Sequence, residues 1–425
     1  MPIVSLQNLG CSKNMVDGER IIHLFKTAGF EISTDLSVAD IIVVNTCAFI
    51  KEAQEEAIDS ILDSASFKKD GQCKTLIVSG CFSERFRDEV ASQFPEVDYW
   101  VGVNDWEEIL PKIYKKMVPS SFERELSVPV ATQYLKIAEG CSHSCSFCVI
   151  PSIRGNFKSR NIESILQEAL WLEEKGVQEL ILIAQDTSFY GRDIGLTLHH
   201  LLENLLKKTR FPWIRLMYLH PRFIDQNLLQ LFAGESRLCQ YFDVPLQHIS
   251  EPVLRAMNRI PLTEGIYKLI ESIRTTLPNA SIRSSFILGF PGEKENHFEE
   301  LKKFIEFARF DRLGVFPFSP EHGTRAKEMK GRPRSTTVTR RCEEIMLLQR
   351  EISREIMESK IGTTLDVIID SVSDNPDFNF EGRTRSDAPE VDGKVLISSG
   401  SFDPGTIHQL KIIGASDYDL FADPL

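Results

Sequence analysis

The stretch ELILIAQD (179–186) begins a series of short apolar segments in the middle of the chain. Its unbroken run of Leu and Ile is typical of a strand buried on both faces of a parallel sheet. Comparable runs follow, with helical patterns between them, at WIRLMYL (213–219), YFDVPL (241–246), SIRSSFILGF (281–290) and LGVFPF (313–318). Several βα units in succession predict a full or partial TIM-like barrel.

The chain before this series shows the same alternation on a smaller scale. IIVVN (41–45) and TLIVS (75–79) resemble buried parallel strands, IVSL (3–6) is a weaker example, and a helical pattern follows each. This order predicts an open α/β domain. The polar stretch near 115–130 is expected to be a linker.

After a basic, helical stretch at 335–359, the pattern changes to short strands separated by Gly, Asp and Pro. The segments LDVIIDSV, FNFEGRT, KVLISS and IHQLKIIGAS predict a small all-β, barrel-like module. The whole chain is therefore expected to be an α/β protein with three domains, at 1–118, 127–358 and 359–425.

Composition narrows the class of protein further. With 42% hydrophobic and 26% charged residues, the 425-residue chain has ordinary globular usage, which excludes disordered, collagen-like and coiled-coil classes. No apolar run approaches the roughly 18 residues that span a bilayer, and MPIVSLQNLGCSKN at the N-terminus has no signal-peptide pattern. We therefore expect a soluble, cytoplasmic protein with no membrane partner.

The net charge of −12 bears on partners. An acidic protein repels the phosphate backbone of nucleic acids and attracts basic proteins. Stable nucleic-acid binding is therefore not expected, and a basic protein partner is.

Nine cysteines, an odd number, in a reducing compartment favour metal-binding or catalytic thiols over a disulfide framework. CSHSCSFC (141–148) places Cys141, Cys145 and Cys148 on one short loop. Three thiolates can hold three irons of a cubane cluster and leave the fourth iron open. The alternative is a structural zinc site completed by His143, although the spacing is awkward and no second cysteine pair follows.

Three further cysteines each follow a predicted strand, in SLQNLGC, IIVVNTC and LIVSGC: Cys11, Cys47 and Cys81. The carboxyl ends of parallel strands share one edge of a sheet, where ligands bind, so these thiols can converge. The alternative is three separate thiols that act as small buried apolar groups. Cys73 precedes its strand and is expected at the opposite edge.

The loop CSHSCSFC resembles the C-x-x-x-C-x-x-C signature of radical S-adenosylmethionine enzymes, including the aromatic Phe147 before the third cysteine. The resemblance implies a barrel fold and a 4Fe–4S cluster on Cys141, Cys145 and Cys148. It also implies that the open iron binds S-adenosylmethionine, and that an electron from the cluster cleaves this cofactor to a 5′-deoxyadenosyl radical. An electron donor is therefore an expected partner.

The segments NLGCSKNMVDGE, NTCAFI and SGC resemble the N-terminal domain of the methylthiotransferases, and the terminal all-β module resembles their TRAM domain. The resemblance implies a second 4Fe–4S cluster, held by Cys11, Cys47 and Cys81, that carries the sulfur to be inserted. It further implies that a second S-adenosylmethionine donates the methyl group.

Two segments resemble family elements near the chemistry. In IPSIRG (150–155), Pro151, Arg154 and Gly155 resemble the tail of the cysteine motif, the alternative being a turn with a solvated Arg154. In SFILGFPGE (285–293), Gly289 and Gly292 resemble a turn that contacts the cofactor, and the alternative is a plain βα turn.

Two other strand ends carry polar side chains on the expected active-site rim of the barrel. Gln185 is a candidate cofactor-binding residue and is followed by Asp186 and Thr187. Gln247 and His248 end another strand, and His248 is alternatively an ordinary polar residue with satisfied hydrogen bonds.

The terminal module points to the substrate. Residues 360–425 carry five basic and twelve acidic side chains, a net charge of −7 that suits a basic protein partner, and the alternative is a surface that only keeps the protein soluble. GRTRSDAPEVDGKV (382–395) resembles the methylthiotransferases that modify the β-carbon of an aspartate in a small-subunit ribosomal protein, so Asp387, Glu390 and Asp392 are expected on the docking surface. The alternatives are a transfer-RNA adenosine methylthiotransferase and a non-catalytic metal-binding protein of ribosome assembly.

Overall fold

The computed structural model describes residues 1–103, 105–106, 110–111, 122–127, 130–260 and 262–425, so most of the expected linker at 115–130 lies outside the described residues. The chain forms two compact units. The N-terminal unit comprises Met1–Ser127, Glu139–His143 and Cys148–Glu168, and the C-terminal unit comprises Val128–Ala138, Ser144–Phe147 and Ala169–Leu425. No helix in the described ranges has both the length and the hydropathy to cross a membrane.

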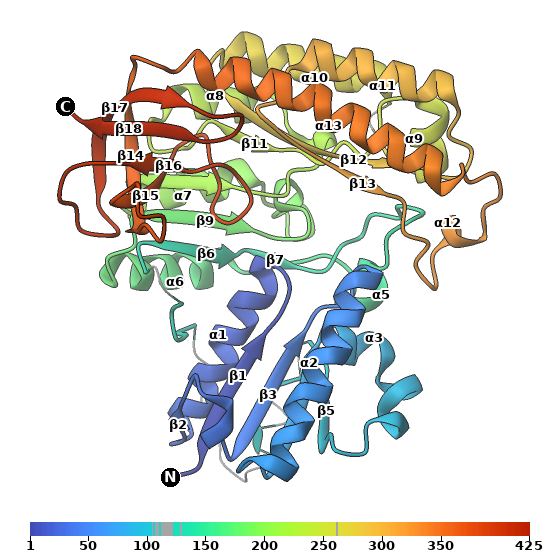
Figure 1. Cartoon of the computed structure of the whole chain (residues 1–425), viewed down its shortest axis with the longest axis vertical. Coiled ribbons are helices and arrows are strands. Elements are labelled where there is room, and N and C mark those ends of the chain that lie inside the picture. The colour runs from blue at the N-terminus through green and yellow to red at the C-terminus, as the bar shows by residue number, and fades with distance from the viewer. Residues whose placement is uncertain (104, 107–109, 112–121, 128–129, 261) are drawn as a thin grey trace. The chain divides into compact units, whose positions relative to one another are not determined.

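The N-terminal unit contains a five-stranded parallel sheet (Figure 1). In spatial order its strands are β2 (Glu31–Ile32), β1 (Ile3–Asn8), β3 (Ile41–Thr46), β4 (Thr75–Gly80) and β5 (Tyr99–Val101). All six residues of β3 are buried, as its unbroken apolar run predicts. The predicted open α/β domain is confirmed.

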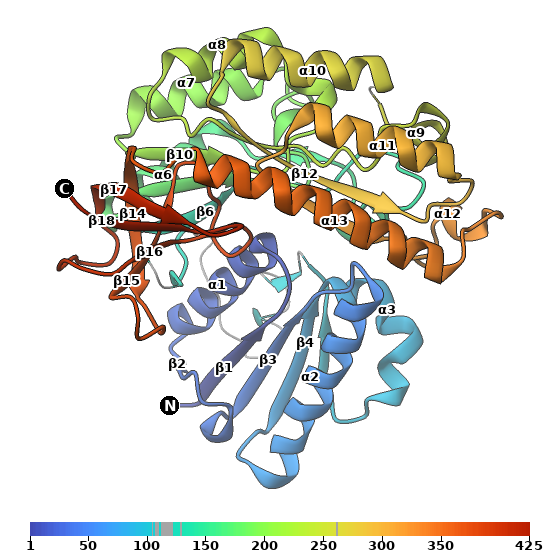
Figure 2. The same ribbon diagram turned by 45° about the horizontal axis from the view of Figure 1, so that its top comes forward.

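Alternate residues of β3 pack into separate cores on the two faces of the sheet. Ile42 and Val44 pack with apolar residues of α2 (Lys51–Asp70) and α3 (Cys81–Val90). Ile41 and Val43 pack with residues of α1 (Ser12–Thr27) on the other face. Figure 2 shows these helices on the two sides of the strands. This three-layer arrangement leaves the carboxyl edge of the sheet for the loops that carry cysteines.

The C-terminal unit begins with a partial barrel of six parallel strands in two sheets. The first sheet contains, in spatial order, β6 (Thr132–Lys136), β9 (Glu179–Ile183) and β10 (Trp213–Leu216). The second contains, in spatial order, β11 (Tyr241–Asp243), β12 (Ser281–Leu288) and β13 (Arg312–Pro317). A bridge from Ile214 to Leu238 links the two sheets. The predicted barrel is confirmed, with the additional strand β6, whose sequence TQYLK shows no apolar run.

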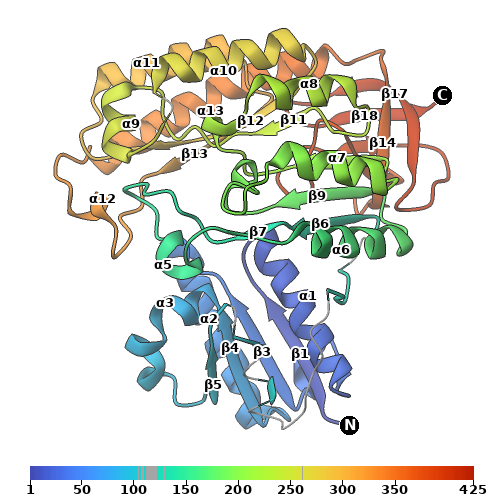
Figure 3. The ribbon, with the colours of Figure 1, turned by 180° about the vertical axis from the view of Figure 1, so that it is seen from behind.

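Helices cover the outer side of these strands, as Figure 3 shows for four of them. They include α7 (Leu198–Lys208), α8 (Gln226–Gly234), α10 (Thr263–Thr276) and α11 (Glu295–Ala308). The long helix α13 (Ser335–Glu358) then leads to the terminal module.

The terminal module is a closed five-stranded barrel, as its sequence predicts. Its strands are β14 (Thr364–Val372), β15 (Phe380–Thr384), β16 (Val395–Ile397), β17 (Ile407–Ala415) and β18 (Leu420–Pro424). Alternate apolar residues such as Val367 and Ile369 fill its core, and Met357 from α13 packs against them. Because α13 contributes to this core, the module is continuous with the helix that precedes it.

Candidate functional site

The structure places three cysteines at the carboxyl edge of the N-terminal sheet, on the loops after the adjacent strands β1, β3 and β4. Cys11 caps α1, Cys47 directly follows β3, and Cys81 is the first residue of α3. Their charges influence one another: Cys81 and Cys11 both act on the pKa of Cys47. The three cysteines therefore lie at one edge of the sheet, whereas Cys73 lies before β4, at the other edge, and their role as ligands of one cluster stays a prediction.

Two glycines allow the loops after β1, β3 and β4 to approach one another. A side-chain carbon placed on Gly10 would lie 2.6 Å from Cβ of Cys47 and 3.1 Å from its Sγ, so only glycine fits. Gly80 has a φ of +87°, and a carbon placed on it would lie 2.5 Å from the carbonyl oxygen of Thr46. The G-C pairs of NLGCSKN and VSGC therefore have a steric reason.

Buried asparagines fix the same edge. The Asn45 amide donates to Asn8 Oδ1 (2.6 Å) and to the Asn14 carbonyl (2.9 Å). The Asn14 amide in turn donates to the Leu9 carbonyl (2.6 Å). Because Asn14 and Asn45 are each only 1% exposed, these bonds hold the loop after β1 against the loop after β3.

The three thiols differ in acidity. Burial raises the pKa of Cys47 to about 11, and the neighbouring Cys81 and Cys11 add to the shift. Burial also raises the pKa of Cys81, against the opposing charge of Arg154. Desolvation acts in the same direction on Cys11, but Lys13, the backbone N–H of Asn14 and Arg154 together bring its pKa below the ordinary value. Three cysteine sulfurs, two of them at helix N-termini, are a donor set that fits an iron–sulfur cluster, which binds cysteines as thiolates.

Arg154 is buried in the N-terminal unit, and the alternative of a solvated side chain is wrong. It ends α5 (Ile150–Arg154), and its Nη2 lies 3.4 Å from Cys81 Sγ. Its Nη1 donates to Asp17 Oδ2 at 2.7 Å. The next residue, Gly155, has a φ of +74° and accepts a hydrogen bond from the Cys141 N–H (3.0 Å).

The loop CSHSCSFC belongs to both units: Cys141 and Cys148 to the N-terminal one, and residues 144–147 to the C-terminal one. Within the C-terminal unit, Ser146 donates from its backbone N–H to the Met257 carbonyl (2.9 Å). Phe147 packs edge-on against Phe290, with ring centroids 6.5 Å apart. The aromatic residue before Cys148 therefore serves to pack the loop against the turn after β12.

That turn is built on Gly289 and Gly292, whose φ values are +80° and +87°. The Gly289 N–H donates to Glu293 Oε2 (2.8 Å), and Arg341 of α13 donates to the other oxygen of Glu293. Burial raises the pKa of Glu293. The sequence reasoning did not single out Glu293 or Arg341, because their pairing joins positions far apart in the chain.

His248 lies beside the same turn, and its Nε2 is buried without a hydrogen-bond partner among the described residues. Its Nδ1 accepts a hydrogen bond from the Ser250 N–H (2.9 Å), so the neutral ring carries its proton on Nε2, which lies 3.9 Å from Glu293 Oε2. Burial lowers the pKa of His248 to about 3, which keeps the ring neutral at physiological pH.

Gln185 is half-buried and lies two residues after β9, at the carboxyl end of the barrel strands where barrel enzymes place their sites. Asp186 caps the turn that follows, since its Oδ1 accepts from Ser188 Oγ (2.6 Å) and from the Phe189 N–H (3.2 Å). Asp186 is thus occupied in local structure, and Gln185 stays a predicted cofactor-binding residue.

The expected docking surface on the terminal module is wrong for two of its three residues. Asp387 is buried and accepts a 2.6 Å hydrogen bond from Arg312 of β13. Asp392 has no exposed side-chain surface and accepts from the Tyr241 hydroxyl (2.6 Å). Only Glu390 is exposed. Asp387 balances the charge of Arg312, and Asp392 accepts a hydrogen bond from Tyr241, so both acids fix the module to the barrel strands.

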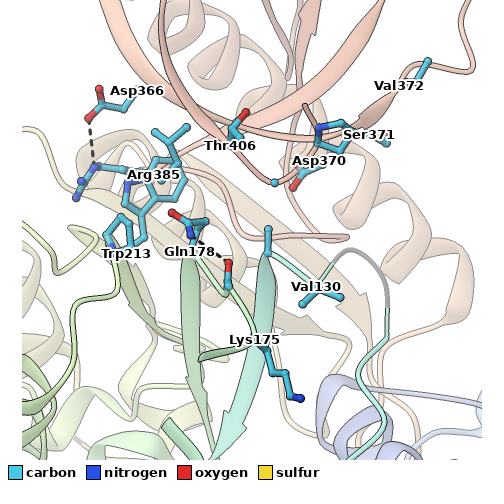
Figure 4. A pocket seen from close by; sticks show the side chains of 16 residues that line it. Val130, Lys175, Gln178, Trp213, Asp366, Asp370, Ser371, Val372, Arg385 and Thr406 are labelled. Carbon is cyan, nitrogen blue, oxygen red and sulfur yellow. Dashed lines mark hydrogen bonds and ion pairs between the residues drawn. The ribbon is translucent and has the colours of Figure 1, made fainter. Parts of the chain in front are cut away.

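A cavity of about 1120 Å³ lies between the terminal module and the barrel (Figure 4). Gln178 and Trp213 line it at the amino ends of β9 and β10, opposite to the end that carries Gln185. Arg385 lies over the Trp213 ring at 5.2 Å and pairs with Asp366 at 3.8 Å. The cavity therefore lies at the end of the barrel away from Gln185, and Arg385 in its wall is already paired with Asp366.

Comparison with solved structures supports the fold. The radical S-adenosylmethionine methyltransferase TsrM from Kitasatospora setae superimposes with a TM-score of 0.57 at 14% identity, over 88% of this chain and 82% of that chain. The cobalamin-dependent S-adenosylmethionine radical enzyme OxsB gives a TM-score of 0.52 at 12% identity, over 82% of this chain and 56% of that one. At these identities the likeness concerns the fold alone.

Comparison with protein families identifies each part of the chain. Residues 4–102 match the uncharacterized protein family UPF0004, residues 135–305 the radical SAM superfamily and residues 361–425 the TRAM domain. The ribosomal protein uS12 methylthiotransferase RimO of Pelobacter propionicus is 42% identical over 99% of this chain and 97% of its own length. The RimO protein of Clostridioides difficile is 39% identical, over 99% and 98%. The chain therefore belongs to the radical S-adenosylmethionine methylthiotransferases, in the family of the ribosomal protein uS12 methylthiotransferases RimO.

Proposed function

We propose that this enzyme adds a methylthio group to the β-carbon of an aspartate in ribosomal protein uS12. The two cysteine triads carry the proposal, because they supply the ligands for the two clusters that the reaction needs. Full-length relatives that are named for this activity support the choice of substrate. We further propose that the chain has three domains, at 1–118, 127–358 and 359–425.

Cys141, Cys145 and Cys148 would hold a 4Fe–4S cluster with one iron free for S-adenosylmethionine, and Cys11, Cys47 and Cys81 would hold a second. When bound, these groups supply a radical that removes hydrogen from an unactivated C–H bond, together with the sulfur and the methyl group. An electron-donor protein is also required. Gly289, Gly292 and Gln185 are the residues proposed to contact S-adenosylmethionine.

The chain's own residues prepare these sites. The Glu293 carboxylate holds the backbone of the Gly289 turn in place, and Arg341 compensates its charge. On the N-terminal sheet, Lys13 and the Asn14 N–H favour the thiolate form of Cys11, which is the form that binds iron. These contacts support the proposed roles of the Gly289 turn and of Cys11.

Iron content tests the two-cluster proposal. Anaerobically reconstituted protein should hold about eight irons per chain, since each triad accounts for one cubane. Cys141→Ala/Cys145→Ala/Cys148→Ala should leave about four irons, and so should Cys11→Ala/Cys47→Ala/Cys81→Ala. Cys342→Ala, a control outside both triads, should keep the full complement. A wild-type content of about four would remove the second cluster from the proposal.

The terminal module still offers exposed acids for a basic protein. Asp374 and Asp377 lie in the turn between β14 and β15, and Asp403 precedes β17; all three are exposed. Changing the three to Asn should slow association with uS12 at low salt, and the difference should shrink at physiological salt, where the Debye length is roughly 8 Å.

Surface plasmon resonance at several salt concentrations measures this effect. Asp59→Asn/Asp63→Asn/Asp70→Asn on α2 is the matched control, because it removes the same charge from another exposed surface. Association at the wild-type rate at low salt by the terminal-module variant would rule out docking through these acids.

A further inference from the structure

We propose that Arg154 raises the reduction potential of the cluster held by Cys11, Cys47 and Cys81 by donating to Cys81 Sγ and by placing a positive charge beside the site. This inference rests on the proposed function, because it requires that this triad binds a cluster. It assigns a role to a residue of the segment IPSIRG, which follows the other cysteine motif in the chain.

The contacts of Arg154 join three parts of the N-terminal unit. Nη2 lies 3.4 Å from Cys81 Sγ, at the start of α3, and donates to Asn14 Oδ1 at 3.2 Å. Nη1 donates to Asp17 Oδ2 at 2.7 Å and to Glu139 Oε2 at 3.3 Å. The guanidinium therefore spans the first turn of α1 and the cysteine of the neighbouring strand end.

Burial makes this charge effective. The Arg154 side chain is 3% exposed, while the Asp17 and Glu139 side chains are 14% and 18% exposed. Arg154 is a cation at this position, because a guanidinium is not deprotonated in proteins. A cation this well shielded from water acts on a neighbouring cluster with little screening.

The direction of the effect follows from cluster chemistry. Net charge, hydrogen bonds to the sulfurs and solvent exposure set the potential of an iron–sulfur cluster. Three thiolates make the site negative, and reduction adds one more negative charge. Arg154 supplies both a positive charge and a hydrogen bond to sulfur, so it stabilises the reduced form. Asp17 opposes it, because its carboxylate is the nearest negative partner of the guanidinium.

A separate group of charges links the same segment to α1. Arg160 donates to Glu168 Oε2 at 2.7 Å, and Arg20 of α1 donates to the same oxygen at 3.0 Å. Glu168 has no exposed side-chain surface, and its ion pairs with Arg20 and Arg160 link this part of the chain to α1 independently of Arg154.

The test uses Cys141→Ala/Cys145→Ala/Cys148→Ala, which retains only the triad in question. A redox titration followed by electron paramagnetic resonance gives the midpoint potential of its cluster. Dithionite supplies the single electron that reduces the cluster, and no covalent bond forms or breaks. In this background Arg154→Gln should shift the potential down, Asp17→Asn should shift it up, and Arg154→Lys should give a smaller downward shift than Arg154→Gln.

Two control variants separate this role from a structural one. Arg160→Gln removes another arginine of the same segment, whose side chain is 18% exposed, and Lys74→Gln removes a positive charge at the opposite edge of the sheet, where Lys74 pairs with Asp40. Both should leave the potential unchanged. If Arg154→Gln fails to fold, Asp17→Asn still decides the question through its upward shift.

The outcomes distinguish the inference from its premise. A parent triple variant that binds no iron would overturn the second cluster and the role of Arg154 with it. A parent with about four irons whose potential is the same with Arg154→Gln and with Asp17→Asn would overturn the role of Arg154 alone.

Discussion

Replacing Cys11, Cys47 and Cys81 with alanine should abolish methylthiolated uS12 while reductive cleavage of S-adenosylmethionine continues. The ligands of the other cluster stay intact in this variant, so the radical can still form, whereas the proposed carrier of sulfur is lost. Mass spectrometry of uS12 and chromatography of 5′-deoxyadenosine measure the two outcomes in one reaction. We expect product to fall below detection, with 5′-deoxyadenosine within a few-fold of wild type.

The control for this variant is Cys73→Ala. Cys73 is a buried cysteine of the same sheet, but it lies before β4, at the edge away from the triad. It should keep methylthio transfer. Product formed at the wild-type rate by the triad variant would show that these three thiols serve structure and not sulfur transfer. Loss of both outcomes would show that the triad also supports the radical step.

The convergence of Cys11, Cys47 and Cys81 could be predicted because it depends only on local patterns. Each of these cysteines directly follows an apolar run, and parallel strands end at one edge of their sheet. The register of β1 on β3 and of β3 on β4 then follows from burial of the same runs. The rule that parallel strands end at one edge of their sheet was therefore sufficient to predict that these three loops lie at the same edge.

The fate of the charged residues could not be predicted in the same way. Asp387 and Asp392 stand in an acidic segment, but their partners Arg312 and Tyr241 come from barrel strands distant in the sequence. Arg154 likewise pairs with Asp17, which lies on the first helix, far from it in the sequence. The sequence shows where a charged residue stands in the chain. Whether that residue is buried depends on a partner far away in the sequence, which no periodic pattern reveals.

The buried pair between Arg312 and Asp387 should be among the costliest to break in the chain. Arg312 is 8% exposed and Asp387 2%. Removing one partner of a buried pair leaves an uncompensated charge and typically costs about 3–5 kcal/mol. Arg312→Ala should therefore lower the free energy of unfolding of the C-terminal unit by that order. Asp387→Asn should have a similar effect, because its amide cannot balance the guanidinium.

Urea unfolding followed by Trp fluorescence and far-UV circular dichroism measures this loss as a lower midpoint. The control is Lys268→Ala, which removes an exposed partner of Glu264 on α10 and should leave the midpoint unchanged. Midpoints of Arg312→Ala and Asp387→Asn that match the control would contradict the view that buried charges fix the terminal module to the barrel.

A double variant locates the origin of the cost. Arg312→Met/Asp387→Leu replaces both charges with apolar side chains, so no buried charge is left unpaired. Such replacements are often close to neutral, because the desolvation penalty of the pair disappears together with its attraction. We therefore expect the double variant to lose less stability than either single variant. A loss equal to the sum of the two single losses would show that packing, and not charge compensation, is what Arg312 and Asp387 contribute.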